Sequence, residues 1–121
     1  FADDVTSART AEQWQDLFAS RPLQRTRSGV WRFREWVLPD IAERDIVTLG
    51  EGGTPLVEAK PLSDELGARI QVKQCGHTAT GSFKDLGMTV LISQVRQMRA
   101  DGLPIRAVAC ASTGELGGAQ R

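Results

Sequence analysis

The sequence predicts an α/β fold, in which a parallel sheet is covered by helices and is preceded by an N-terminal extension of helical and irregular structure. From about residue 56, short apolar runs typical of strands alternate with helical patterns. This strand–helix–strand–helix order begins a βαβ unit, which favours parallel strands. We therefore divide the chain into an extension, residues 1–50, and the first part of a second domain, residues 51–121.

The extension begins with a helix. Residues 10–13, Thr-Ala-Glu-Gln, match a capping box, in which the first and last side chains each bond to the other's backbone. Trp14, Leu17 and Phe18 follow at helical spacing. The pattern predicts a helix that ends near Ala19.

An aromatic segment at residues 30–38 follows a basic connection. Its aromatic side chains are spaced unevenly, so neither a helical nor a strand period fits. Since aromatic side chains dominate core burial, we expect Trp31, Phe33 and Trp36 to pin the extension to a larger body.

The second domain is predicted from turn residues and hydrophobic spacing. The long helix in it has apolar residues at helical spacing, and Ser82 is its expected cap. Ordered along the chain, the expected elements are a strand at 56–57, a short helix at 63–66 ended by Gly67, a strand at 69–73, a loop at 76–81, the long helix at about 86–98, a strand at 105–110 and a turn at 112–114 into a further helix.

Composition argues against two classes of partner. The 15 Lys and Arg residues balance 15 Asp and Glu residues, whereas a protein that binds the phosphate backbone of nucleic acids normally has a basic excess. The apolar runs are far shorter than the roughly 20 residues of a membrane-spanning helix. Cys75 and Cys110 lack the paired spacing of zinc ligands. We expect no nucleic acid, no membrane and no metal.

Residues 80–85, Thr-Gly-Ser-Phe-Lys-Asp, lead into the long helix and are the first candidate for chemistry. Ligands bind at such turns in open α/β sheets, because strand ends converge there with the free N–H groups of helix N-termini. Lys84 is a candidate nucleophile toward a carbonyl group, although its position alone favours a solvated surface lysine. Asp85 fits either an ion pair with Lys84 or the favourable place of a carboxylate in a first helical turn.

A phosphate-binding P-loop is a competing interpretation of the same region. Residues 76–81 have its Gly-x-x-x-x-Gly spacing, but Ser82 and Phe83 stand where Lys and Ser or Thr are required. The lysine comes two positions late. Nucleotide hydrolysis is therefore a poor second hypothesis.

Four ordered segments of the chain resemble one enzyme family. Residues 75–76 with 80–91 closely resemble the cofactor-lysine segment of the threonine synthase family, especially its plant-type branch, and residues 110–114 resemble its next signature. The earlier segments are Trp31 with residues 35–39, and residues 51–52 with 54–56. Single short motifs often match by chance, but four in the family's order do so far less readily. In residues 1–28 we identify no segment of the family.

The resemblance implies a fold-type II pyridoxal-phosphate enzyme, a lyase of threonine biosynthesis that converts O-phosphohomoserine and water to threonine and phosphate. By this resemblance Lys84 binds pyridoxal 5'-phosphate covalently and moves protons during elimination, and Phe83 lies near the cofactor ring. Ser112, Thr113 and Gly114 hold the substrate carboxylate, for which a turn with free N–H groups is suited. The family pattern also implies a homodimer in the cytoplasm, or in the plastid if the source is a plant.

Glu115 and Leu116 depart from the family pattern. Relatives usually carry Asn or Asp and then Thr at these positions, at a point where close contact with the cofactor or substrate is expected. Glu115 is one methylene longer than Asp, and Leu116 lacks the hydroxyl. Two alternatives therefore stay open: a truncated homologue without catalysis, and a related fold-type II serine or threonine dehydratase, against which residues 36–39 argue.

The chain starts at Phe1 and stops at Arg121. The family's glycine-rich loop for the cofactor phosphate lies further along than this, and the binding of a multiply charged phosphate normally draws on such a nest of N–H groups or on a helix N-terminus. We therefore expect an N-terminal segment of a longer enzyme, with negligible activity and weak cofactor affinity by itself.

Overall fold

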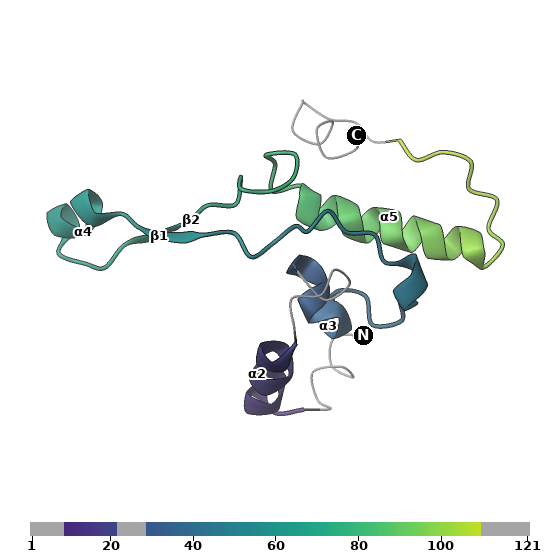
Figure 1. The fold of residues 1–121 in the computed structure, drawn as a ribbon, viewed down its shortest axis with the longest axis horizontal. Helices are drawn as coiled ribbons and strands as arrows, with labels where there is room; N and C mark the ends of the chain where they lie inside the picture. Colours follow the sequence, from purple (N-terminus) through teal and green to yellow (C-terminus); the bar gives the residue numbers. More distant parts are fainter. Residues whose placement is uncertain (1–8, 22–28, 110–121) are drawn as a thin grey trace.

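The computed structural model describes residues 9–21 and 29–109. Within them α5 is the longest element, and the chain that leads towards β1 runs beside it (Figure 1). None of the described helices is both long and apolar enough to span a membrane. The elements in chain order are α2 (Ala11–Ser20), η2 (Gly29–Phe33), α3 (Arg34–Val37), η3 (Glu43–Asp45), β1 (Leu56–Glu58), α4 (Lys60–Leu66), β2 (Gln71–Lys73) and α5 (Asp85–Ala100).

Helix α2 confirms the predicted helix and its capping box. The Thr10 hydroxyl accepts a hydrogen bond from the Gln13 backbone nitrogen at 3.3 Å, and the Gln13 side chain accepts one from the Thr10 nitrogen at 2.9 Å. The helix ends at Ser20, one residue beyond the expected end. Trp14 and Phe18 form its buried face.

Of the three aromatic side chains expected to anchor the extension, Trp31 is buried within the described chain, whereas the anchoring by Phe33 and Trp36 to a larger body stays a prediction. These two side chains pack against α2: both rings meet Phe18 edge-on with centroids 4.9 Å apart. They remain 38% and 52% exposed, respectively. The segment consists of a 3₁₀ helix followed by one α-helical turn, so no single period describes its spacing and its aromatic side chains face different neighbours.

The small apolar core surrounds Trp31, which is fully buried. Ile41 and Ile46 complete this core, and Val30, Leu38 and Val90 pack against it. The indole nitrogen of Trp31 donates a hydrogen bond to the backbone oxygen of Val47 at 2.9 Å, which satisfies the one polar atom of this side chain. Since Val90 belongs to α5, the core joins the extension to that helix.

The face of α5 that the described chain covers is largely polar. Asp85, Met88, Thr89 and Ser93 are buried, whereas Leu91 and Ile92 are 40% and 37% exposed. The amphipathic spacing correctly predicted the helix. It did not predict which face is covered, because polar side chains of α5 bond to backbone groups of the preceding segment.

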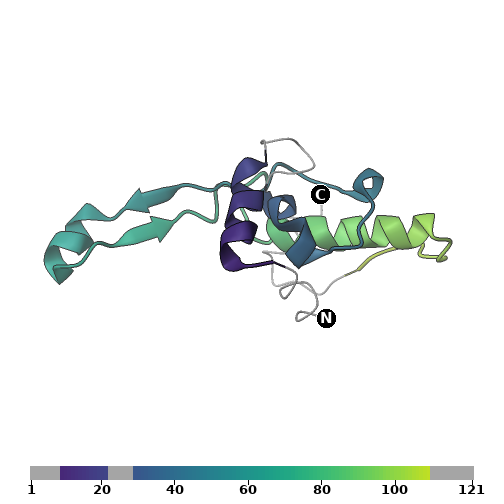
Figure 2. The ribbon, with the colours of Figure 1, turned by 90° about the horizontal axis from the view of Figure 1, so that it is seen from below.

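The segment β1–α4–β2 projects away from α5 and from α2 in both ribbon views (Figures 1 and 2). Its two strands pair antiparallel, with Val57 opposite Val72. We call residues 56–73 the arm. Its strands match the predicted ones, but every strand residue is exposed, so the expected half-buried strand is not found within the described chain.

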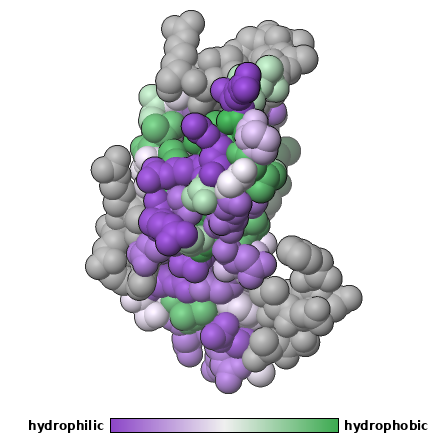
Figure 3. All heavy atoms as spheres, turned by 90° about the vertical axis from the view of Figure 1, so that its right-hand side faces the viewer, coloured by the Kyte–Doolittle hydropathy of each residue, from purple (hydrophilic) through white to green (hydrophobic). Residues whose placement is uncertain are grey.

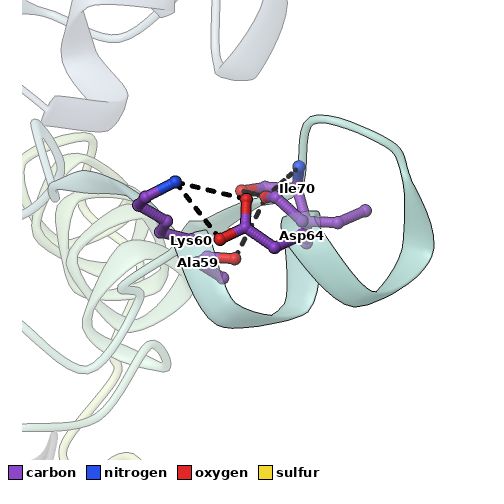
Figure 4. A network of polar contacts seen from close by, with 5 residues as sticks. Ala59, Lys60, Asp64 and Ile70 are labelled. Carbon is purple, nitrogen blue, oxygen red and sulfur yellow. Dashed lines mark hydrogen bonds and ion pairs between the residues drawn. The ribbon is translucent and has the colours of Figure 1, made fainter.

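Helix α4 closes the tip of the arm through its own side chains. Ser63 donates a hydrogen bond to the Ala59 backbone oxygen at 3.0 Å and accepts one from the Ile70 nitrogen at 2.9 Å. Its two partners, Ala59 and Ile70, are labelled in Figure 4. Gly67 ends the helix with a positive φ of 61°, as predicted. These contacts join the residue that follows β1 to the residue that precedes β2.

The described chain thus mixes helices with a small sheet, but the pairing found in it is antiparallel. The predicted strand at 105–110 is irregular over its described part, residues 105–109. Seen from the end where α5 terminates, much of the surface is hydrophilic, with separate hydrophobic patches (Figure 3). The described chain therefore shows the α/β composition without the expected parallel sheet.

Candidate active site

The turn into α5 is shaped by short-range hydrogen bonds. The Thr78 hydroxyl donates to the Ser82 backbone oxygen at 2.8 Å, and the Gly81 nitrogen donates to the Thr78 oxygen at 3.1 Å. Gly81 has a φ of 78°, a conformation that glycine adopts at low cost. This turn reverses the chain immediately before Ser82, Phe83 and Lys84.

Lys84 lies at the N-cap of α5, one position before the first helical residue. Its backbone nitrogen donates to the Ser82 hydroxyl at 3.2 Å. Ser82 therefore caps the turn at Lys84, whereas the prediction that Ser82 caps the long helix is wrong. The helix begins at Asp85, close to the expected start, and the residues before it form a tight turn.

The side chain of Lys84 lies over the ring of Phe83, with the amine 4.3 Å from the ring centroid. A lysine ammonium over an aromatic face is weakly attracted by the negative face of the ring. Lys84 is half-buried, and Phe83 is 49% exposed. The pair presents an amine beside a flat apolar surface.

The chain has three lysines, and the structure describes all of them. Lys60 bonds to both carboxylate oxygens of Asp64 at 3.2 Å. Lys73 donates to the backbone oxygen of Thr54. Lys84 has no hydrogen-bond acceptor or carboxylate partner among the described residues. Its amine is thus the least engaged of the three.

Asp85 bonds to Thr80 and not to Lys84. One carboxylate oxygen accepts from the Thr80 hydroxyl at 2.6 Å, and the other accepts from the Thr80 nitrogen at 3.0 Å. Burial raises the pKa of Asp85, but the hydrogen bonds from the Thr80 side chain and backbone outweigh burial, so its pKa is lowered. The ion pair considered from sequence is absent, and the pairing with Thr80 is a feature that sequence analysis missed.

The first N–H groups of α5 are paired, contrary to the expectation of free donors. Their bonds reach back three residues, as in a 3₁₀ turn. The three bonds run from Asp85 N to Ser82 O at 3.1 Å, from Leu86 N to Phe83 O at 3.3 Å and from Gly87 N to Lys84 O at 3.0 Å. This helix end therefore lacks the unpaired donors that would bind a phosphate group.

The expected substrate-binding residues lie outside the described part of the chain. They are Ser112, Thr113 and Gly114, together with Glu115, which the family pattern places near the cofactor. Their positions relative to Lys84 therefore stay predictions.

Comparison with known proteins identifies the family. A family model described as "Pyridoxal-phosphate dependent enzyme" matches residues 47–120. The chain belongs to this family. Among curated members, the chain is 45% identical over 114 residues to "Threonine synthase 2, chloroplastic" of Arabidopsis thaliana, a match that covers 89% of this chain and 22% of the relative. The match therefore includes part of residues 1–28, in which the sequence motifs alone showed no resemblance.

Two further members of the pyridoxal-phosphate dependent enzyme family are similar to the chain. It is 44% identical over 104 residues to the threonine synthase of Methanocaldococcus jannaschii, covering 85% of the chain and 24% of the relative. It is 52% identical over 68 residues to the threonine synthase of Mycobacterium leprae, covering 56% of the chain and 18% of the relative. The chain thus spans about a fifth of the length of the relatives that it matches.

Membership in the pyridoxal-phosphate dependent enzyme family requires an amine that can bind an aldehyde and a surface for its ring. The chain offers both at Lys84 and Phe83: a half-buried amine with no acceptor in the described residues, and a half-exposed aromatic ring beside it. The residues present fit the cofactor's aldehyde and ring. The first N–H groups of α5 are paired and so do not supply free donors for its phosphate.

Proposed function

We propose that the chain is the N-terminal segment of a threonine synthase, which converts O-phosphohomoserine and water to L-threonine and phosphate. The observation that carries this proposal is the amine of Lys84, the only lysine of the chain without a hydrogen-bond acceptor in the described residues, in a segment that the family model matches. The names of the three relatives support a synthase in preference to a dehydratase.

In this proposal Lys84 has two roles. Its amine holds pyridoxal phosphate covalently, and it later takes and returns protons at the substrate carbon atoms while phosphate leaves. Pyridoxal phosphate, when bound, supplies an electron sink for the negative charge that develops on the substrate. Phe83 provides the apolar surface beside the amine. The absence of an acceptor for the amine supports this assignment, because no bond within the described chain must be broken first.

Ser112, Thr113 and Gly114 bind the substrate carboxylate in the proposed enzyme. A turn of small residues can present backbone N–H groups and hydroxyls to an anion. Glu115 lies close to the cofactor or substrate by the same family pattern. These four assignments rest on sequence resemblance alone.

The proposal includes a wider architecture. Residues 51–121 belong to a catalytic domain whose sheet is parallel and covered by helices, with residues 1–50 as an extension. Exposed apolar side chains on the arm support the proposal that further parts of the enzyme pack against it. Among them are Leu56, Leu66 and Val72, which are 56%, 59% and 44% exposed. The proposed enzyme is a cytoplasmic or plastid homodimer that acts on a small molecule.

The cofactor assignment is tested by borohydride reduction of the full-length protein with pyridoxal phosphate, followed by peptide mapping. We expect the pyridoxyl label on the peptide that contains Phe83 and Asp85. Lys60 and Lys73 are internal controls, since both amines already have acceptors. A label on either of these, and none on Lys84, contradicts the assignment.

The reaction is tested separately by measuring phosphate release from O-phosphohomoserine. We expect the full-length protein to release phosphate and its Lys84→Ala variant to release essentially none. Labelling of Lys84 without phosphate release would favour a homologue with another activity. The 121-residue chain by itself is expected to be inactive.

A further inference from the structure

The loop that precedes α5 is closed by two hydrogen bonds between Thr80 and Asp85, which we call the clasp. Both carboxylate oxygens are used: one accepts from the Thr80 hydroxyl at 2.6 Å, and the other from the Thr80 nitrogen at 3.0 Å. Asp85 is fully buried, whereas Thr80 is exposed. A carboxylate is costly to bury unless its oxygens are hydrogen-bonded, so the clasp explains how Asp85 can be buried.

Two simpler explanations of Asp85 do not account for this geometry. An ion pair with Lys84 is not formed: the carboxylate is turned to Thr80, and the Lys84 amine lies over Phe83. Attraction to the positive end of the helix dipole acts on an exposed carboxylate as well. It requires neither complete burial nor two bonds to one residue. The clasp therefore serves to fix the loop.

The main chain of Lys84 is held inside this closed loop. Its nitrogen donates to the Ser82 hydroxyl at 3.2 Å, and its oxygen accepts from the Met88 nitrogen at 2.9 Å and from the Gly87 nitrogen. Asp85, the next residue, is tied back to Thr80. The backbone of Lys84 is thus constrained on both sides, while its side chain has no polar partner in the described residues.

We infer that Asp85 is a positioning residue, which acts through Thr80 to fix the direction in which Lys84 leaves the backbone. The inference rests on the proposed function, because the position of Lys84 matters only if its amine reacts. Asp85 forms no ion pair with the Lys84 amine, because both of its carboxylate oxygens bond to Thr80. Its effect is on the rate at which the amine meets the cofactor aldehyde, since misplacement of a reacting group by about 1 Å can lower a rate about 100-fold.

The test compares Thr80→Val with Thr80→Ser in the full-length protein. Valine keeps the branched shape of threonine but lacks the hydroxyl, whereas serine keeps the hydroxyl and can keep both bonds. Pyridoxal phosphate is added to the cofactor-free protein, the mixture is reduced with borohydride at set times, and the labelled Lys84 peptide is quantified. We expect Thr80→Val to slow labelling about tenfold or more, and Thr80→Ser to stay within about twofold of the wild type.

Asp85 variants give a second comparison. An asparagine amide can accept from the Thr80 nitrogen and donate to the Thr80 hydroxyl oxygen, so Asp85→Asn can keep the clasp, whereas Asp85→Ala loses it. We expect Asn to label much faster than Ala. Ser63→Ala is the control, since it removes hydrogen bonds from the arm and leaves the loop unchanged.

Hydrogen exchange of the cofactor-free protein gives a readout that does not depend on the cofactor. The amides of Thr80 and Lys84 should exchange faster in Thr80→Val than in Thr80→Ser, and Ser63→Ala should leave them unchanged. Equal exchange and equal labelling in the two Thr80 variants would overturn the inference. If the wild type is not labelled at Lys84, the proposed function fails, and the exchange data still decide whether the clasp holds the loop. If Asp85→Ala does not fold, the comparison of Thr80→Val with Thr80→Ser still tests the inference.

Discussion

The hydroxyl of Ser93 in α5 lies 2.8 Å from the backbone nitrogen of Val47, from which it accepts a hydrogen bond. Ser93 is fully buried, and its own proton is donated to the Thr89 oxygen at 2.6 Å. One turn along the helix, Gln97 accepts from the Ala42 nitrogen at 2.8 Å. Side chains of α5 thus bond to the backbone of residues 42–47 and join the helix that follows Lys84 to this earlier segment.

Replacing Ser93 with alanine should free the segment around Val47. The substitution leaves a partly buried backbone N–H group without an acceptor, which costs about 1–3 kcal/mol. We expect the free energy of local opening at the Val47 amide, measured by hydrogen exchange in the full-length protein, to fall by about this amount. Ser20→Ala is the control, because Ser20 is exposed and its hydroxyl bonds within α2, to the Leu17 oxygen. Unchanged exchange at Val47 would contradict the role of Ser93.

Gly29 and Gly53 provide a matched pair for the contact between the extension and the next segment. Their φ angles are 57° and 59°. A Cβ atom at Gly29 would overlap the backbone oxygen of Glu51, whereas one at Gly53 would meet no atom of the described residues within 4 Å. Alanine at Gly53 therefore adds only backbone strain, about 1–2 kcal/mol. At Gly29 the backbone must also move.

We expect Gly29→Ala to lower the thermal unfolding midpoint of the full-length protein much more than Gly53→Ala does. Glu51 is the reason that the contact cannot easily relax. Its buried carboxylate accepts from the Thr48 hydroxyl at 2.7 Å and from the Leu49 nitrogen at 2.8 Å, which fixes the backbone that the new Cβ would displace. Equal shifts of the unfolding midpoint for the two variants would show that Gly29 and the Glu51 backbone are not tightly packed in solution.

Local signals in the sequence predicted local structure well. The capping box at Thr10 and the left-handed glycine at Gly67 depend on neighbours within a few residues, and both are confirmed. The clasp between Thr80 and Asp85 also spans few residues, but its recognition requires the turn at Gly81, which the composition of the loop does not specify. Lys84 was identified as a candidate from its place before the helix and from the family resemblance.

Long-range features could not be predicted in the same way. The spacing of apolar residues in α5 fixes a helix but not its partner, and the partner in the described chain uses Ser93 and Gln97. The strand expected at 105–110 needs a neighbour for its hydrogen bonds, and residues 105–109 pair with no described strand. A run of apolar residues therefore indicates a strand only where a sheet is available.

Acid should weaken the contact between α2 and the aromatic segment through Glu35. Burial raises the pKa of Glu35, but hydrogen bonds and charge attraction from Arg21 outweigh it and hold the pKa below its usual value of 4.5. The two side chains form two hydrogen bonds, one of them 2.9 Å long. Since the folded pKa is the lower one, this stabilisation is present above pH 4.5 and is lost as the pH falls through the folded pKa.

Tryptophan fluorescence during acid titration measures this effect, because Trp14 and Trp36 pack together at the same contact. We expect Glu35→Gln to remove a transition that begins below about pH 4.5. Glu12→Gln is the control, since Glu12 is exposed and forms no ion pair within the described chain. A transition that persists in Glu35→Gln would assign it to another carboxylate.

Glu115 is the departure from the family pattern that we most expect to affect substrate binding in the proposed enzyme. It lies outside the described residues. If Ser112, Thr113 and Gly114 bind the substrate carboxylate, an ionised Glu115 beside them repels it. At about 4 Å and an effective dielectric constant near 20, this repulsion is about 4 kcal/mol before the side chain relaxes. Such repulsion weakens substrate binding.

Two neutral variants separate the charge of Glu115 from its length. Glu115→Gln removes the charge at constant length, and Glu115→Asn also shortens the side chain to that of the family pattern. We expect both to lower the KM for O-phosphohomoserine in the full-length protein, by about tenfold if about 1.4 kcal/mol of the repulsion survives relaxation. A lower KM for Asn alone would make length the cause. Unchanged kinetics in both would mean that Glu115 points away from the substrate, and a large loss of activity would mean that its carboxylate takes part in the reaction.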